Sequence, residues 1–262
     1  MNNTKLKSIA SEVLKLEGQE LLDAAERIAE SVVKASDIIS NHSGKVVLCG
    51  MGKSGLIAQK IAATLCSIGN KAVFLHAAEA VHGDLGIYAP GDPTILISKS
   101  GATEEMLRLI PILKEFNSPL IGILGNMKSP LVRKMDVVLD ASVKKEADPL
   151  GIVPTSSTTL TLAIGDAIVG VLMSQREFKQ DDFARLHPAG DLGRKLPPAE
   201  RQAIEILNGK SNMGKQQLRV LYKGLIKDLH PDMNGGNRSD EDQLQKVVWA
   251  WDQIKDSRRF SD

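Results

Sequence analysis

The sequence predicts an α/β fold in which helices cover both faces of a parallel sheet, followed by a small all-helical module. Short β-branched runs alternate with helical patterns over the first two thirds of the chain. Two turns, GMGKSG at 50–55 and SKSGAT at 98–103, each follow such a run and open a helix. Both tryptophans, Trp249 and Trp251, lie in the last fifteen residues, which indicates a separately built C-terminal module.

The spacing of apolar residues places the elements in order. Helical spacing over 4–40 predicts two helices, or one helix bent at Gly18. Strands that alternate with helices then favour a sheet buried on both faces. The predicted strands cover 45–49, 72–75, 94–97, 120–124 and 137–141. One predicted helix follows the turn at 50–55 and runs to Leu65, and another opens at Glu104 and runs to about Phe116. A short helix near Leu131 and a helix over 155–172 complete the set, with a loop or short helix over 76–89.

A change of pattern at Pro197 and Pro198 predicts two domains, 1–196 and 200–262, joined by a linker at 197–199. The chain has 262 residues, is 42% apolar and carries a net charge of +1. It is therefore globular, and its overall field gives no reason to expect nucleic acid or an anionic membrane as a partner.

Three further features bear on the compartment. No apolar run approaches the roughly 18 residues that span a bilayer. The start of the chain reads as an amphipathic helix and not as a signal peptide, so we expect a cytoplasmic protein. Cys49 and Cys66 are too far apart for a CxxC site, and we expect both to be reduced and buried.

Hydroxyl side chains crowd the turn within 94–106, where an apolar run stops at Ser98 and Ser100, Gly101 and Thr103 precede Glu105. Unpaired N–H groups, the positive end of a helix dipole and several hydroxyls would meet there, and such a set binds phosphate. An ordinary N-cap, with Thr103 or Ser100 capping the helix, explains the same residues. These residues alone leave both interpretations open.

The turn at 50–55 matches the dinucleotide fingerprint GxGxxG after a strand. However, no acidic residue closes the next strand, and Val47 stands where a P-loop needs its first glycine. A tight glycine turn is the plain alternative. Lys53 would project from this turn at the carboxyl end of the sheet, where ligands bind in such folds, and is a candidate site residue.

Several segments together resemble the sugar isomerase (SIS) domain. Within that family they closely resemble the arabinose-5-phosphate isomerases, which supply the precursor of the lipopolysaccharide sugar Kdo. The resemblance covers about 5–196 and implies a three-layer, flavodoxin-like fold. It implies an aldose-ketose isomerase that interconverts D-arabinose 5-phosphate and D-ribulose 5-phosphate without metal or nucleotide cofactor, as a homotetramer or dimer. The segments are KS at 53–54, HAAEAVHGDLG at 76–86, SKSGAT at 98–103, KEADPLG at 145–151, PTSSTT at 154–159 and HPAGDLGRKL at 187–196.

The resemblance also implies roles for individual residues. We assign Glu146 as the proton shuttle, His187 as the acid/base that opens the sugar ring, Lys53 as oxyanion stabiliser and Glu105 as a second acid/base or hydroxyl clamp. The division of work between the two glutamates stays open, and His187 could complete a neighbouring subunit's site. The expected phosphate and substrate contacts are Ser54, His82, Ser98, Ser100, Gly101, Thr103, Thr155, Ser156 and Ser157.

Each of these residues has an ordinary reading as well. Glu105 could be a partner of the helix dipole, Glu146 a loop charge, Lys53 a solvated side chain and His187 a loop histidine. The sequence departs from the family pattern in two places. Lys99 stands inside the phosphate turn, where it could add charge to the site or point away, and no pair of CBS regulatory modules follows 194–196.

Instead, residues 200–262 resemble a J-domain, the module by which DnaJ-type co-chaperones act on a DnaK-type chaperone. The segments are IEIL at 204–207, YKGLIKDLHPD at 222–232 and AWDQIKDSRR at 250–259. Apolar stripes on two helices predict a helical hairpin. The resemblance implies that a chaperone would be contacted by His230, Pro231, Asp232, Lys223 and Lys227.

The alternatives to an isomerase are a phosphosugar sensor or a co-chaperone in which the SIS fold only binds ligand. Two glutamates and His187 speak against a sensor. A nucleotide-binding protein that uses 50–55 is a third and weaker alternative.

Overall fold

The computed structural model describes residues 2–187, 198–210, 212–230, 241–255 and 257. It divides into two compact units, 1–178 and 179–262, which are treated separately below. The first unit contains the sheet and the candidate site. The second contains the C-terminal helices.

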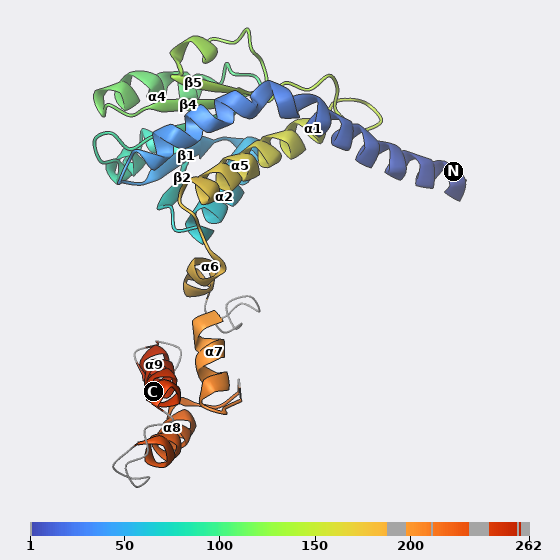
Figure 1. Cartoon of the computed structure of the whole chain (residues 1–262). Coiled ribbons are helices and arrows are strands. Elements are labelled where there is room, and N and C mark those ends of the chain that lie inside the picture. Colours follow the sequence, from blue (N-terminus) through green and yellow to red (C-terminus); the bar gives the residue numbers. More distant parts are fainter. Residues whose placement is uncertain (1, 188–197, 211, 231–240, 256, 258–262) are drawn as a thin grey trace. The chain divides into compact units, whose positions relative to one another are not determined.

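The first unit is built on a five-stranded parallel sheet in the order β2-β1-β3-β4-β5 (Figure 1). The chain moves outward from β1 to β2, then crosses back over β1 to β3. Strand order therefore reverses between β1 and β3, and ligands of such sheets bind outside the carboxyl ends of the strands at that point. The strands are β1 Val46–Gly50, β2 Ala72–His76, β3 Thr94–Ser98, β4 Leu120–Leu124 and β5 Val137–Asp140.

Helices cover both faces of this sheet, as predicted. On one face α1, α2 and α5 pack together, and α3 and α4 cover the other. The elements are α1 Asn3–Ser40, α2 Gly52–Ser67, α3 Ala77–Ala80 and α4 Glu104–Glu115, followed by α5 Ser156–Gln175, with 3-10 turns at η1 Asp84–Ile87 and η2 Val132–Lys134.

Strand residues alternate between the two core clusters because successive side chains point to opposite faces. In β1, Val46 and Leu48 pack against the α1, α2 and α5 layer, whereas Val47 and Cys49 pack against the α3 and α4 layer. All five residues of β1, β3 and β4 are buried. The unbroken β-branched runs that predicted these strands therefore reflect burial on both sides.

Two helices need comment. α1 continues through Gly18 as one helix, the second of the two predicted possibilities, and a side chain at that position would meet nothing. The second is α5, because we expected no segment long and apolar enough to span a membrane. Among the described helices, α5 is the one whose length and mean hydropathy would fit such a span. Nine of its residues are buried, and most of these belong to the core shared with α1 and α2, which accounts for its apolar character.

The prediction of two buried cysteines was half wrong. Cys49 lies buried in β1, but Cys66 is exposed near the end of α2. An apolar stretch in an amphipathic helix has an outward face, and Cys66 falls on it.

The second unit consists of helices α6 Gln180–Leu186, α7 Pro198–Ile206, α8 Lys215–Leu229 and α9 Glu241–Lys255. α7 and α8 each pack against α9 around a core that includes Leu207, Leu218, Val247 and Ile254. The two units divide at residue 178, earlier than the predicted linker. α7 begins at Pro198 inside that linker, since proline is favoured in the first helical turn.

Asp92 ties together the amino ends of β1, β3 and β4, opposite the edge expected to bind ligand. Its fully buried carboxylate accepts hydrogen bonds from His42 Nε2 at 2.9 Å, Lys45 Nζ at 2.5 Å and the backbone N–H of Ala89 at 2.8 Å. Its carbonyl accepts from Ser118 Oγ at 2.6 Å. Burial works to raise the pKa of Asp92, but the bonds from Lys45, Ala89 and His42 outweigh it and hold that pKa at about 2.

We therefore expect Asp92→Asn to destabilise the protein by about 2 kcal/mol at pH 7, since a pKa lowered from 3.8 to about 2 stabilises the ionised folded state by that amount. This stability is present above the unfolded pKa and disappears as pH falls from about 5 to 2. Urea unfolding of wild type and variant across that range should show the gap closing. Asp166→Asn, which breaks the exposed pair with Lys60, should change stability by less than about 1 kcal/mol. Equal effects of the two substitutions would contradict the anchoring role of Asp92.

Candidate active site

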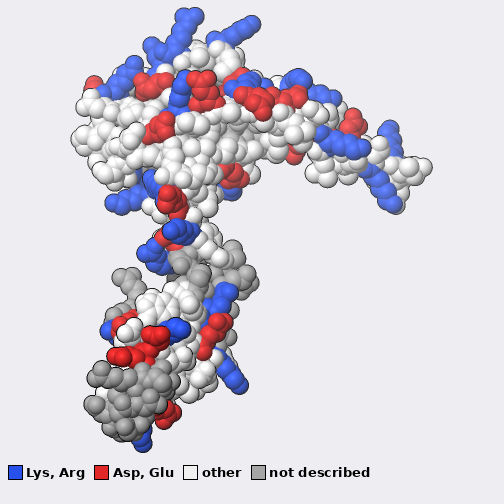
Figure 2. All heavy atoms as spheres, viewed as in Figure 1, with Lys and Arg blue, Asp and Glu red and all other residues white. Residues whose placement is uncertain are grey.

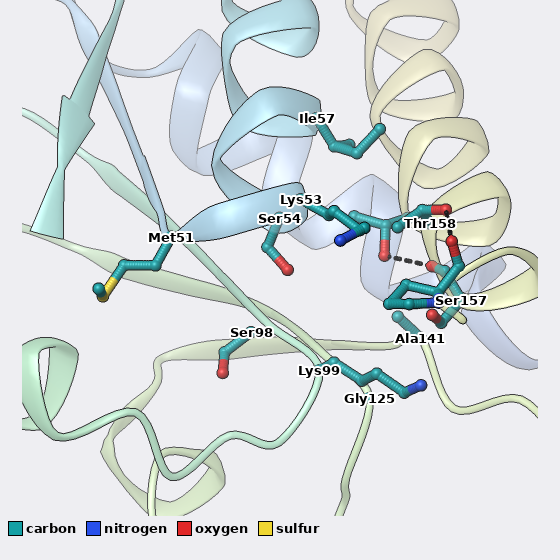
Figure 3. Close-up of a pocket in the computed structure, with 12 residues that line it drawn as sticks. Met51, Lys53, Ser54, Ile57, Ser98, Lys99, Gly125, Ala141, Ser157 and Thr158 are labelled. Carbon is teal, nitrogen blue, oxygen red and sulfur yellow. Dashed lines mark hydrogen bonds between the residues drawn. The ribbon is translucent and has the colours of Figure 1, made fainter. Parts of the chain in front are cut away.

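A cavity opens at the carboxyl end of the sheet, where strand order reverses between β1 and β3. It holds about 200 Å³. Figure 3 shows Lys53 and Ser54 from the start of α2 near Ser157 and Thr158 from the start of α5, with Ser98 and Lys99 at the end of β3. The remaining lining residues are Met51, Ile57, Gly125, Ala141, Pro154 and Thr161.

A second hollow of about 480 Å³ adjoins this cavity and shares Met51, Ser54, Ser98 and Lys99 with it. Its other lining residues include three polar ones, Ser100, Thr103 and Asn126. The two hollows therefore form one site. We call the end lined by Ser54, Ser98, Ser100 and Thr103 the hydroxyl-rich end. The other end carries Lys53 and further hydroxyls from Ser157, Thr158 and Thr161.

Two long helices begin at the hydroxyl-rich end without a side-chain cap. α2 starts after Met51 and α4 starts after Thr103, and neither N-cap side chain bonds the helix N–H groups. The Thr103 hydroxyl instead pairs with Ser98 Oγ at 2.9 Å, and Ser98 Oγ accepts from the N–H of Gly101 at 3.0 Å. The capping role considered for Thr103 is therefore wrong, and both helix starts offer N–H groups and positive dipole ends to an anion.

Glu146 occupies the start of α5. One carboxylate oxygen accepts from the backbone N–H groups of Thr155 at 2.8 Å and Ser157 at 3.1 Å, and from Thr155 Oγ1 at 3.3 Å. The other oxygen accepts from Ser157 Oγ at 2.5 Å and from Lys99 Nζ. Only 4% of this side chain is exposed, so Glu146 is a buried anion with fixed partners and not a loop charge.

These contacts decide the charge of Glu146. Burial works to raise its pKa, but the bonds from Lys99, Ser157 and Thr155 outweigh it and lower the pKa of Glu146 to about 2. The carboxylate is therefore ionised at neutral pH. A group with so low a pKa is also a weak base, which bears on its predicted work as proton shuttle.

Lys99 points into the site, which answers the question left by the sequence. Its ammonium reaches Glu146 across 47 positions of sequence, and its side chain is 49% exposed. Among the described residues that line the two hollows, Lys53 and Lys99 are the two cations.

The structure gathers some of the predicted residues and leaves others apart. Lys53, Ser54, Ser98, Ser100, Thr103 and Ser157 all line the site, and Gly101 lies in the same turn at φ 62°. Glu105 is half-buried in the first turn of α4, and neither it nor the buried Glu146 is among the lining residues. Thr155 and Ser156 do not line the hollows either. His82 is exposed after α3 and does not line the site either. His187 belongs to the second unit, so its part in the site stays a prediction.

Two hydroxyls of 155–159 have a carboxylate partner within the protein, and their part in phosphate binding stays a prediction. Thr155 and Ser157 donate to Glu146, and Ser156 is buried with a hydroxyl that has no partner. The sequence could not predict that Glu146 binds at the start of α5, because a helix N-terminus can bind either a phosphate or a carboxylate.

Sequence reasoning missed Gly125 and Asn126, which follow β4 directly. The rule that selected Ser98, a polar residue just after a strand, would have found Asn126 as well. Gly125 is needed for a different reason, since a side chain there would meet the backbone oxygen of Lys99 at 2.7 Å. Over the described residues, no group of three or more His, Cys, Asp or Glu is placed to hold a metal ion.

The chain is similar in sequence to proteins of known function. The chain is 48% identical over 185 residues to the arabinose 5-phosphate isomerase KdsD of Salmonella typhi, which covers 71% of this chain and 56% of the relative. It is 50% identical over 160 residues to the arabinose 5-phosphate isomerase KpsF of Escherichia coli O6:H1, which covers 61% of this chain and 49% of the relative. The chain thus spans about half the length of the curated relatives it matches.

A solved structure of an E. coli CFT073 protein in complex with arabinose 5-phosphate superposes with a TM-score of 0.68 at 38% identity, covering 72% of this chain and all of that one. The SIS domain family matches residues 38–170. That range is about half of the chain and holds every residue that lines the two hollows. The chain therefore belongs to the SIS domain family.

Proposed function

We propose that the first unit is an aldose-ketose isomerase that interconverts D-arabinose 5-phosphate and D-ribulose 5-phosphate. The observation that carries the proposal is the single site in which Lys53 and Lys99 adjoin two uncapped helix starts, with Lys99 paired to the buried Glu146 beside it. The relatives named arabinose 5-phosphate isomerases support this choice of substrate. A role in supplying the lipopolysaccharide precursor, in the cytoplasm, follows from the same proposal.

The substrate phosphate would sit at the hydroxyl-rich end. Ser54, Ser98, Ser100 and Thr103 line that end, and α2 and α4 both begin there. Hydroxyls and backbone N–H groups bind a phosphate without an arginine. The start of α5 is the less suitable seat, because Glu146 already takes its donors.

The sugar carbons would then lie toward Lys53 and Ser157. Isomerisation moves a proton from C2 to C1 through an enediol, while a second proton passes from the C2 hydroxyl to the C1 oxygen. Lys53 would stabilise the oxyanion that develops on the carbonyl oxygen. Glu146 and Glu105 remain the candidates for the carbon proton, and Glu146 must lose a hydrogen-bond donor before it becomes a useful base.

His187 would open the sugar ring as a general acid and base. It lies in the second unit, stacked on Phe183 with ring centroids 3.8 Å apart. The oligomer suggested by the family would let a neighbouring chain supply this histidine, so assembly would be required for activity.

The test is an assay for ketose formation from D-arabinose 5-phosphate. We expect wild type to form D-ribulose 5-phosphate and Glu146→Gln to lower kcat by about 100-fold or more, the usual loss when a proton-transfer group is removed. Glu104→Gln, which alters an exposed glutamate paired with Arg108, should leave kcat within about twofold.

Wild type that binds the sugar phosphate without forming ketose would instead support the phosphosugar sensor. Wild type that acts on other aldose phosphates but not on this one would overturn the proposed substrate.

The second unit supports a second candidate function, that of a J-domain-like co-chaperone. α8 and α9 pack side by side, and Tyr222 stacks on Trp251 with ring centroids 5.0 Å apart. Arg219, Lys223 and Lys227 lie exposed on α8, and His230 follows its last residue. Pro231 and Asp232 lie outside the described residues.

This candidate predicts that the full chain stimulates the ATPase of a DnaK-type chaperone. His230→Gln should abolish the stimulation, and Lys223→Glu should weaken it by reversing a charge on the contacting face. Lys246→Gln, on α9, should leave it unchanged. An ATPase rate that the wild-type chain does not alter would rule out the co-chaperone and leave the isomerase proposal untouched.

A further inference from the structure

Lys99 and Glu146 form an ion pair whose two members differ in freedom. Glu146 is 4% exposed, whereas Lys99 is 49% exposed. Besides Lys99, the carboxylate accepts from two N–H groups and two hydroxyls at the start of α5. None of these four bonds involves Lys99. Glu146 would therefore keep its position if Lys99 left.

The backbone of Lys99 is fixed, so such a departure involves its side chain alone. The N–H of Gly125 donates to the carbonyl of Ser98 at 3.1 Å, and a side chain at Gly125 would collide with Lys99 O. The turn is further held by the bonds of Ser98 Oγ to Gly101 and Thr103. The ammonium of Lys99 is therefore attached to a fixed backbone by a flexible four-carbon side chain.

A second anion is expected within reach of this side chain. Lys99 lines both the cavity beside Glu146 and the hydroxyl-rich hollow in which the phosphate would sit. A phosphate monoester carries about −1.5 to −2 charges at neutral pH and has three acceptor oxygens. It is a stronger partner for an ammonium than one carboxylate oxygen that Ser157 Oγ already serves.

Resting on the proposed isomerase, we propose that Lys99 is a positioning residue that exchanges between two anions: it bonds Glu146 in the empty site and the substrate phosphate in the loaded site. Binding of a phosphorylated sugar then removes one donor from Glu146. Because the bond from Lys99 helps to lower the pKa of Glu146, its loss raises that pKa and makes the carboxylate a better base. The phosphate would thus prepare the group that moves the carbon proton.

Two variants of the full chain test the exchange, Lys99→Met, which keeps the length but removes the charge, and Lys99→Arg, which keeps the charge. Lys128→Met is the control, since this exposed lysine follows β4 but lines neither hollow. The first measurement is calorimetric titration with inorganic phosphate, which requires no isomerase activity. We expect Lys99→Met to weaken binding about 10-fold or more, Lys99→Arg to stay within about threefold of wild type, and the control to bind as wild type does.

The second measurement follows Glu146 itself, in protein with ¹³C-labelled glutamate carboxyls and with the signal assigned by Glu146→Gln. Phosphate should move the wild-type signal toward the position it has in phosphate-free Lys99→Met. In Lys99→Met, phosphate should cause little further movement. If Lys99 only stabilised the fold, phosphate would not shift the Glu146 signal in a way that depends on Lys99.

The exchange is overturned if phosphate binds equally tightly to wild type and to Lys99→Met, or does not bind to wild type at all. It is also overturned if phosphate does not shift the Glu146 signal of wild type. Kinetics with D-arabinose 5-phosphate separate this outcome from failure of the proposed function. An active wild type should show a KM that rises about 10-fold or more in Lys99→Met and recovers in Lys99→Arg. A wild type that forms no ketose but passes both binding tests overturns the isomerase and retains the exchange.

Discussion

The carboxylate of Glu146 at the start of α5 is the interaction on which the site depends. It joins three parts of the first unit: the loop after β5, the first turn of α5 and, through Lys99, the turn after β3. An unpaired buried carboxylate would be costly, and a helix start compensates it with N–H groups and a favourable dipole. In the same arrangement Lys99 is half exposed, whereas its partner Glu146 is buried and fixed. Glu146 thus holds the site together and is also a candidate for the catalytic base.

The three helix N-termini at the carboxyl edge of the sheet have different roles. α5 neutralises an anion of the protein itself, whereas α2 and α4 begin without side-chain caps beside the hydroxyls of Ser98 and Ser100. The amino edge is different in kind, because Asp92 there connects β1, β3 and β4 through its bonds to Lys45, Ala89 and Ser118. Lys, Arg, Asp and Glu side chains are intermixed over the visible face (Figure 2), and the net charge of the chain is only +1. The overall charge therefore gives little attraction for an anionic substrate.

Most of the first unit could be predicted from sequence because its strands are buried on both faces. Each predicted strand lies within one residue of the observed one, since β-branched runs of about five residues leave little choice. The hydroxyl turn and Lys53 were predicted for the same reason, as both follow such strands. What could not be predicted depends on contacts between distant residues. The direction of Lys99 and the bond between Ser157 and Glu146 are decided by tertiary contacts and not by local pattern.

In the proposed isomerase the hydroxyl-rich hollow, and not the start of α5, holds the substrate phosphate. A crystal structure of the protein with D-arabinose 5-phosphate would test this placement. We expect phosphate oxygens within hydrogen-bond distance of Ser54, Ser98, Ser100 or Thr103. We also expect the ammonium of Lys99 to turn to the phosphate, and Glu146 to stay bonded to Thr155 and Ser157. A phosphate bound instead at the start of α5, with Glu146 displaced, would contradict this placement.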